Sequence, residues 1–169
     1  MVGFFEDEYY EEEDTQHGRY LIFSLDGSMY GLPIRFVTEV VPIQPVTRVP
    51  ETPGYVKGII NLRGRIIPIV DVRLKFGKQE IPYNDRTCII VIDVNAVVVG
   101  LVVDKVNDVL TIEDSQIAQP PAGGTLGFEN RYIDGIGKSG DMVLLLLNAE
   151  KLLRADEMEM IDEIASDNT

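Results

Sequence analysis

The sequence predicts a mainly β protein in which two similar lobes share one core, and two observations support this prediction. Short β-rich runs bounded by turn residues follow one another along most of the chain. The chain also repeats itself, because residues 31–43 (GLPIRFVTEVVPI) match residues 100–112 (GLVVDKVNDVLTI) without a gap. A repeat of this length indicates two lobes whose apolar faces meet, and such lobes form a groove more readily than a deep pocket. A binding module is therefore favoured over an enzyme.

The second half of the repeat is looser. Residues 55–58 (YVKG) correspond to residues 132–135 (YIDG), and each segment is followed by a glycine turn and an apolar run. The two stretches end the same number of residues later, at Asp71 and at Asn148. Many short strands in two copies predict a pair of small barrels of the SH3-like kind.

Composition narrows the class of protein. The chain has 169 residues, of which 45% are hydrophobic, so it can bury a real core. Its apolar runs are far shorter than the ~20 residues that span a bilayer, and no secretory signal is present, so we expect a cytoplasmic protein. Cys88 is the only cysteine, which excludes an internal disulfide and suits core packing. A net charge of −13 argues against nucleic-acid binding.

Part of this charge lies in residues 6–14 (EDEYYEEED). Such a run has little to bury, so residues 1–18 are expected to form a disordered acidic tail, with an acidic docking segment as the alternative. His17, the single histidine, lies in this tail. The chain therefore cannot build a histidine-based metal site or a Ser-His-Asp triad.

Turn signals place the strands of the first half. Residues 20–25 and 28–32 flank Asp26 and Gly27, a pair that favours a type I′ hairpin. Residues 33–40 fit either a strand or a turn of helix, and the prolines of residues 46–54 indicate a connection. Residues 56–62 and 66–72 read as strands joined by an Arg-Gly-Arg turn.

The second half follows the same pattern. Polar residues 75–86 suggest a lobe boundary, with lobes of about 31–86 and 87–147 that exchange strands at their ends. Predicted strands are 87–94, 97–103, 106–112, 131–137 and 142–147, and residues 119–130 are expected to form a mobile loop. Asn148 can cap a helix over residues 148–165, and Asp156 with Glu159 resembles a second capping arrangement.

Motifs for chemistry are weak. Residues 135–140 (GIGKSG) fit G-x-G-x-x-G, but an apolar strand follows rather than the helix that a dinucleotide site needs, so we expect a hairpin turn. Residues 137–139 mimic the end of a P-loop, although Tyr132 stands where its first glycine would be. Asp71 and Asp104 belong to carboxylates scattered singly among the strands, for which surface or turn roles are expected.

The most specific motif of the chain is residues 61–64 (NLRG), followed by RIIPIVD at residues 65–71. Together with residues 37–40 (VTEV), 47–50 (TRVP), 102–104 (VVD) and 106–110 (VNDVL), these motifs resemble the CheW family of chemotaxis coupling proteins over residues 19–155. The resemblance implies two SH3-like five-stranded barrels around a shared core, followed by a C-terminal helix. It also implies an adaptor without catalytic activity or cofactor, which joins methyl-accepting chemoreceptors to the histidine kinase CheA.

The resemblance further implies that the helical tip of a receptor lies in the groove between the barrels. The matching receptor-binding positions here are Leu21, Ile34, Val37, Glu39, Arg63, Val106 and Val109. The repeat independently places Val37 and Val106 along the seam between the lobes, although each valine could equally be barrel core. Glu39 and Arg63 could contact the receptor or pair with each other.

The kinase contact is expected at the ends of the barrels, with Gly58, Asn61 and Arg65 as candidates, although Gly58 could serve backbone geometry alone. Two other classes remain open. A small β-barrel enzyme or ligand carrier would require a closed polar pocket with converging titratable groups. A scaffold that forms rings would differ from the adaptor only in its partners.

Overall fold

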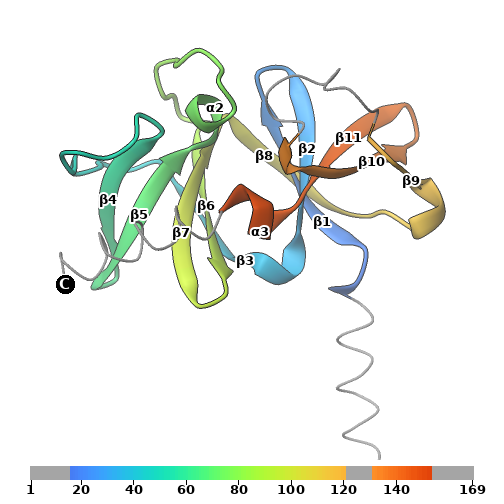
Figure 1. Cartoon of the computed structure of the whole chain (residues 1–169), viewed down its shortest axis with the longest axis horizontal. Helices are drawn as coiled ribbons and strands as arrows, with labels where there is room; N and C mark the ends of the chain where they lie inside the picture. The colour runs from blue at the N-terminus through green and yellow to red at the C-terminus, as the bar shows by residue number, and fades with distance from the viewer. Residues whose placement is uncertain (1–15, 121–130, 154–169) are drawn as a thin grey trace, which may run out of the picture.

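The computed structural model describes residues 16–120 and 131–153 (Figure 1). Most of the predicted acidic tail, the greater part of the predicted 119–130 loop, and the predicted helix beyond residue 153 lie outside the described residues, as does the capping arrangement at Asp156. Within the described residues, no helix has the length and apolarity that crossing a bilayer requires.

The described chain is made of short strands with brief helical turns between them, which confirms the predicted mainly β class. The strands are β1 (Arg19–Leu25), β2 (Ser28–Pro33), β3 (Val37–Pro42), β4 (Val56–Leu62), β5 (Arg65–Asp71), β6 (Cys88–Val94), β7 (Val97–Val103), β8 (Lys105–Thr111), β9 (Ile117–Ala118), β10 (Ile133–Ser139) and β11 (Met142–Leu147). The helical turns are η1 (Ile34–Phe36), α2 (Val72–Lys75), η2 (Asp114–Gln116) and α3 (Ala149–Leu152).

Tight two-residue turns close the hairpins where the sequence predicted them. Asp26 and Gly27 have φ of 53° and 80°, and Asn95 and Ala96 have φ of 51° and 68°, as a type I′ turn requires. The G-x-G-x-x-G segment forms β10 and its turn into β11, so it is a hairpin, as expected. The ambiguous segment after β2 contains both alternatives, a 3₁₀ turn and then a strand.

The strands form two sheets, seen side by side in Figure 1. The order β3-β6-β7-β5-β4 makes the five-stranded lobe, and β8-β1-β2-β11-β10-β9 makes the six-stranded lobe. The sheets divide the chain differently from the expected limits of 31–86 and 87–147. The hairpin β6–β7 pairs with strands of the first half, and the hairpin β1–β2 pairs with strands of the second half. Each repeat has therefore exchanged its entire first hairpin, not only terminal strands.

The repeat is visible in backbone contacts. β5 pairs in parallel with β7, and β11 pairs in parallel with β2, at equivalent positions of the two lobes. The Asp71 amide donates to the Tyr55 carbonyl, and the Asn148 amide donates to the Tyr132 carbonyl, each at 2.8 Å. Asp71 then caps α2 and Asn148 caps α3 through their side chains. The loosely matched second halves of the repeat are thus equivalent in structure.

Three apolar clusters hold the fold together. Each sheet curls around one small cluster of its own, centred on Ile69 and Ile89 in the five-stranded lobe and on Ile22 and Leu144 in the six-stranded lobe. A third and larger cluster contains residues from both sheets, from α3 and from Phe76 after α2. This cluster is the shared core that the sequence predicted, and its outer edge positions the candidate site.

Candidate functional site

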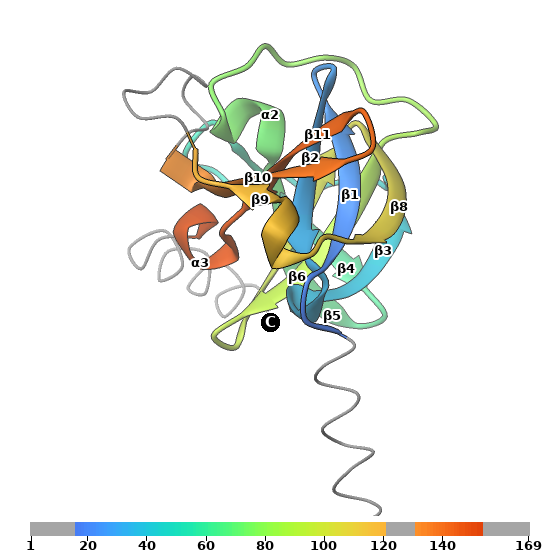
Figure 2. The ribbon, with the colours of Figure 1, turned by 90° about the vertical axis from the view of Figure 1, so that its right-hand side faces the viewer.

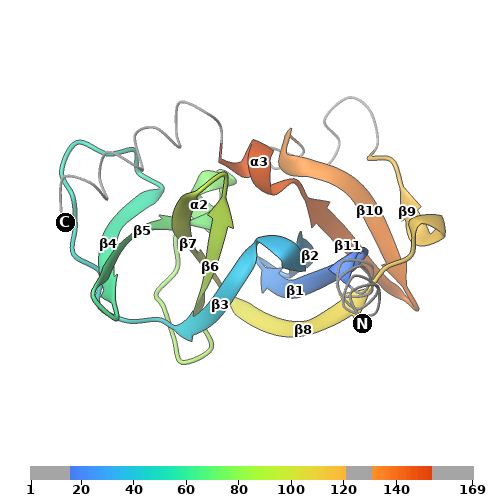
Figure 3. The same ribbon diagram turned by 90° about the horizontal axis from the view of Figure 1, so that it is seen from below.

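β3 and β8 are edge strands of their respective sheets, and both begin at the junction of the two lobes (Figure 3). Val37 lies opposite Ile92 of β6, and Val106 lies opposite Phe23 of β1. Each valine is partly buried against the shared core. A β-bulge follows at the equivalent place in each strand, so the two valines have matching surroundings. The structure thus brings together the two positions that the repeat had paired.

Ile34 of η1 and Val109 of β8 extend this edge of the shared core, and both are also partly buried. We call Ile34, Val37, Val106 and Val109 the apolar seam. Phe36 packs against the same core and carries Arg35 above its ring at 4.8 Å. Phe36 was not among the receptor-binding positions expected from the sequence, although its place between Ile34 and Val37 in a mainly apolar segment was a signal for it.

Leu21 has a different position from the other predicted receptor-binding residues. It is 5% exposed and lies opposite Val109 on the neighbouring strand. Its side chain therefore supports the seam from within the shared core, and a partner would contact Val109 rather than Leu21 itself.

Glu39 and Arg63 form an ion pair with each other, one of the two alternatives left open by the sequence. Their side chains are 32% and 67% exposed. Glu39 belongs to β3 and Arg63 to the β4–β5 turn, so the pair joins the two outer strands of the five-stranded lobe. Exposed ion pairs of this kind contribute at most about 1 kcal/mol to stability. The pair is therefore accessible to a partner and costs little to rearrange.

Of the predicted kinase-binding residues, Asn61 and Arg65 flank the same β4–β5 turn, whereas Gly58 lies near the start of β4. Asn61 and Arg65 are exposed, and the Asn61 side chain accepts a hydrogen bond from the Gly64 amide at 2.8 Å. Gly58 is buried, with φ of 142°, and a Cβ there would overlap the Thr47 carbonyl. The backbone role of Gly58 is evident, whereas Asn61 and Arg65 can reach another molecule.

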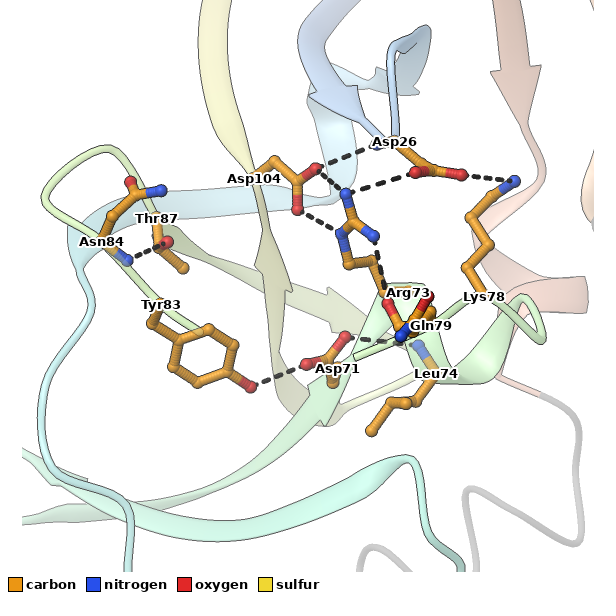
Figure 4. A network of polar contacts seen from close by, with 10 residues as sticks. All are labelled: Asp26, Asp71, Arg73, Leu74, Lys78, Gln79, Tyr83, Asn84, Thr87 and Asp104. Carbon is orange, nitrogen blue, oxygen red and sulfur yellow. Dashed lines mark hydrogen bonds and ion pairs between the residues drawn. The ribbon is translucent and has the colours of Figure 1, made fainter. Parts of the chain in front are cut away.

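A polar cluster lies at the junction of the lobes, on α2 and the segments around it (Figure 4). Arg73 is 9% exposed and donates two hydrogen bonds to the Asp104 carboxylate. Burial alone would raise the pKa of Asp104, but the hydrogen bonds from Arg73 and the Asp26 amide, with the charge of Arg73, hold it below its usual range. Asp104 thus lies in the turn between β7 and β8, one of the two roles expected from the sequence, but its pairing with Arg73 was not foreseen.

Next to this cluster, Asp71 is 3% exposed and uses both carboxylate oxygens. One oxygen caps α2 at the Leu74 amide, and the other accepts from the Tyr83 hydroxyl at 2.7 Å. Burial and the bond to Asp71 raise the pKa of Tyr83, so its hydroxyl stays protonated and keeps donating. The cap role agrees with the predicted turn role, although its burial was not foreseen.

Two surface hollows lie elsewhere in the described structure. One is lined mainly by the start of β1, η1 and the strands β9–β11, and the other by the β3–β4 connection and residues of the β5–β6 connection. Neither is lined by a predicted receptor-binding residue. Tyr20 borders the first hollow, and burial, followed by the charges of Asp114 and Asp134, raises its pKa. The described residues contain no group of His, Cys, Asp and Glu side chains suited to a metal ion.

Comparison with known proteins identifies the family of this chain. Residues 19–157 match the CheW-like domain family. The chain is 41% identical over 153 residues to the chemotaxis protein CheW of Klebsiella aerogenes, covering 90% of this chain and 91% of that protein. It is 33% identical to CheW of Helicobacter pylori over 86% of this chain and 87% of that protein.

A solved structure shows the same architecture. The crystal structure of the scaffolding protein TtCheW from Thermoanaerobacter tengcongensis superimposes with a TM-score of 0.75 and 34% sequence identity, covering 83% of this chain and 94% of that chain. The expected pair of SH3-like lobes is thereby confirmed, with β9 as a sixth strand in one of them. The chain belongs to the CheW-like family.

Proposed function

We propose that this protein is a non-enzymatic chemotaxis adaptor that couples methyl-accepting chemoreceptors to the histidine kinase CheA. Its relatives of similar length carry the name chemotaxis protein CheW, and the similar solved structure is described as a scaffolding protein. The adaptor acts in the cytoplasm, where it is recruited to membrane-associated receptor arrays. No cofactor is required for this role.

The observation that carries the proposal is the apolar seam between two edge strands. Val37 and Val106 are equivalent, partly buried and placed where β3 and β8 begin. A helical hairpin from a receptor tip presents an apolar stripe that fits such a seam, in the helix-in-groove mode. Ile34 and Val109 extend the contact, and Leu21 supports it from beneath.

Glu39 and Arg63 form the charged rim of this binding site. Arg63 adopts φ of 53°, a conformation that is unfavourable for most residues other than glycine. The equivalent turn position in the other lobe is Gly140, with φ of 61°. An arginine kept at a position where the repeat has glycine supports a role in binding, because its guanidinium can clamp a partner carboxylate.

For the kinase, the exposed Asn61 and Arg65 at the β4–β5 turn form the contact, and Gly58 shapes the strand behind them. Asn61→Asp keeps the acceptor for the Gly64 amide but adds a negative charge. This variant should weaken binding to the CheA regulatory domain while leaving receptor binding unchanged. If Asn61→Asp bound CheA as tightly as the wild-type protein does, this assignment would be refuted.

The receptor interaction can be tested with matched substitutions. Val37→Glu places a charge in the seam, whereas Val143→Glu places the same charge on β11 at a valine that is 57% exposed. Binding to a soluble receptor cytoplasmic fragment is measured by co-sedimentation and fluorescence anisotropy. We expect Val37→Glu to weaken binding at least tenfold, because the buried charge stays unpaired, and Val143→Glu to leave it unchanged. Equal affinities of both variants would overturn the seam as the binding site.

A further inference from the structure

The chain returns from the five-stranded lobe to the six-stranded lobe through a single residue, Asp104. β7 of the five-stranded lobe ends at Val103, and β8 of the six-stranded lobe begins at Lys105. Arg73 holds this crossing with two parallel hydrogen bonds, Nε to Oδ1 at 2.8 Å and Nη2 to Oδ2 at 2.9 Å (Figure 4). Bonds of this two-pronged type fix direction as well as distance.

The same cluster also attaches the β1–β2 turn. The Asp26 amide donates to Asp104 Oδ2 at 2.9 Å, and the Asp26 carboxylate lies 3.4 Å from Arg73 Nη2 and 3.7 Å from Lys78 Nζ. Arg73 Nη1 donates to the Gln79 carbonyl at 3.0 Å. We call Asp26, Arg73, Lys78 and Asp104 the interlobe cluster. It joins the six-stranded lobe, the crossing and the end of the five-stranded lobe at one point.

We propose that Arg73 is a positioning residue for the apolar seam: by clamping Asp104 it fixes where β8 leaves the five-stranded lobe, and so where Val106 stands opposite Val37. This inference rests on the proposed function, since the seam is the receptor-binding site. Arg73 itself does not contact the receptor.

The position of β8 depends on this clamp for two reasons. β8 is an edge strand whose only partner among the described strands is β1. Its ladder with β1 is interrupted by the bulge between Ile22 and Phe23, at the level of Val106 and Asp108. Between the bulge and Asp104, only two register pairs with β1 remain, Phe23–Val106 and Ser24–Lys105, together with the Ser24–Asn107 hydrogen bond of 2.9 Å. Loss of the Arg73 bonds therefore leaves the segment that carries Val106 with this short ladder alone.

The repeat supplies an internal comparison. The equivalent crossing, from β2 to β3, has Arg35 in the place of Asp104, and α3 has Glu150 in the place of Arg73. No ion pair joins Arg35 to Glu150 in the described structure, and η1 occupies the crossing instead. One side of the seam is therefore clamped and the other is not. In the wild-type protein, hydrogen exchange of the β3 amides should therefore be faster than that of the β8 amides.

The test uses Arg73→Met in the full-length protein, with Lys57→Met as the matched control. Lys57 of β4 forms an ion pair with Glu80 in the connection between α2 and β6, away from the crossing at Asp104. Hydrogen exchange of segments 37–42, 88–94 and 104–111 is followed by mass spectrometry, and affinity for a receptor cytoplasmic fragment is measured in parallel. We expect exchange in 104–111 to rise at least tenfold in Arg73→Met beyond the change in 88–94, and affinity to fall about tenfold. Lys57→Met should change neither.

The outcomes separate the two proposals. If 104–111 exchanges alike in both variants, or if it loosens while receptor affinity stays at the wild-type value, the positioning role is wrong. If the wild-type protein itself does not bind the receptor fragment, the proposed function fails, and the positioning role, which depends on it, fails as well. Should Arg73→Met not fold, Arg73→Lys and Asp104→Asn replace it. Both remove the two-pronged bond, Arg73→Lys without a change of charge and Asp104→Asn with one acceptor oxygen kept, and wild-type exchange of 104–111 in both would overturn the inference.

Discussion

Gly58→Ala should be strongly destabilising, and the structure gives the size of the effect. Gly58 has φ of 142°, and an added Cβ would overlap the Thr47 carbonyl oxygen and lie 2.7 Å from its carbon. The strained φ costs about 1–3 kcal/mol. Relief of the overlap also breaks the two hydrogen bonds between Thr47 and Ile59, of 2.8 and 2.9 Å, at about 1 kcal/mol each. The expected loss is about 3–5 kcal/mol of a total of about 5–15 kcal/mol.

The repeat and a surface glycine provide controls. Gly135 is the equivalent of Gly58, but its added Cβ would meet the Ile117 side chain at 2.7 Å, which can rotate away, so about 1–2 kcal/mol is expected. Gly54 has nothing within 4 Å, and Gly54→Ala should be nearly neutral. Urea unfolding monitored by circular dichroism gives the loss of unfolding free energy for all three variants. In thermal unfolding, Gly58→Ala should lower Tm by roughly 10 °C. A loss below 1 kcal/mol for Gly58→Ala would refute the reasoning and return Gly58 to the list of direct kinase contacts.

Three further predictions concern single side chains. Because folding lowers the pKa of Asp104, this carboxylate stabilises the fold fully above its unfolded pKa, and the stabilisation is lost as pH falls through its folded pKa. The difference in unfolding free energy between the wild-type protein and Asp104→Asn should therefore shrink below about pH 4. Arg63→Gly should change unfolding free energy by less than about 1 kcal/mol while weakening receptor binding in anisotropy titrations, and unchanged affinity would count against Arg63. Asn148→Ala should cost about 1 kcal/mol as a lost cap, and Asp71→Ala about 2–4 kcal/mol because Tyr83 also loses its buried acceptor; equal losses in denaturant would contradict this.

The sequence predicted the strands well, because the hairpins are closed by local signals. Asp26-Gly27 and the Arg63-Gly64 turn announce their hairpins within a few residues. The parallel pairings of β2 with β11 and of β5 with β7 have no such signal, since no turn joins these strands. For that reason the exchange of whole first hairpins between the repeats was not foreseen, and the expected lobe limit near residue 86 does not match the sheets.

The candidate site, like the fold, was predicted from the sequence only in part. Val37 and Val106 could be paired from the sequence, because the repeat aligns them without a gap. The clamp between Arg73 and Asp104 could not, because its members are 31 positions apart and are brought together by the parallel pairing of β5 with β7. A bond of this kind depends on which distant strands pair, and a single sequence does not specify that. Asp104 thus looked like one more scattered carboxylate.

Divergence between the two copies gives the seam a direction. A perfectly symmetric seam would accept a helical hairpin in two orientations related by the repeat, because Val37 and Val106 would be interchangeable. In the proposed site the charged rim would remove this ambiguity, because Arg63 of one lobe is replaced by Gly140 in the other, whereas Glu39 and its equivalent Asp108 carry the same charge.

The charge balance of the described residues is consistent with these proposed roles. The described residues carry equal numbers of acidic and basic side chains, so the net charge of the chain lies in the remaining segments. A neutral body offers little long-range attraction, and affinity must then come mainly from the apolar seam. Individual charges such as Arg63 act at short range, where they favour one orientation by leaving the other with unpaired groups. Under the proposed function, the equivalent valines would supply the binding energy, and the charge that differs between the lobes would decide the orientation of the partner.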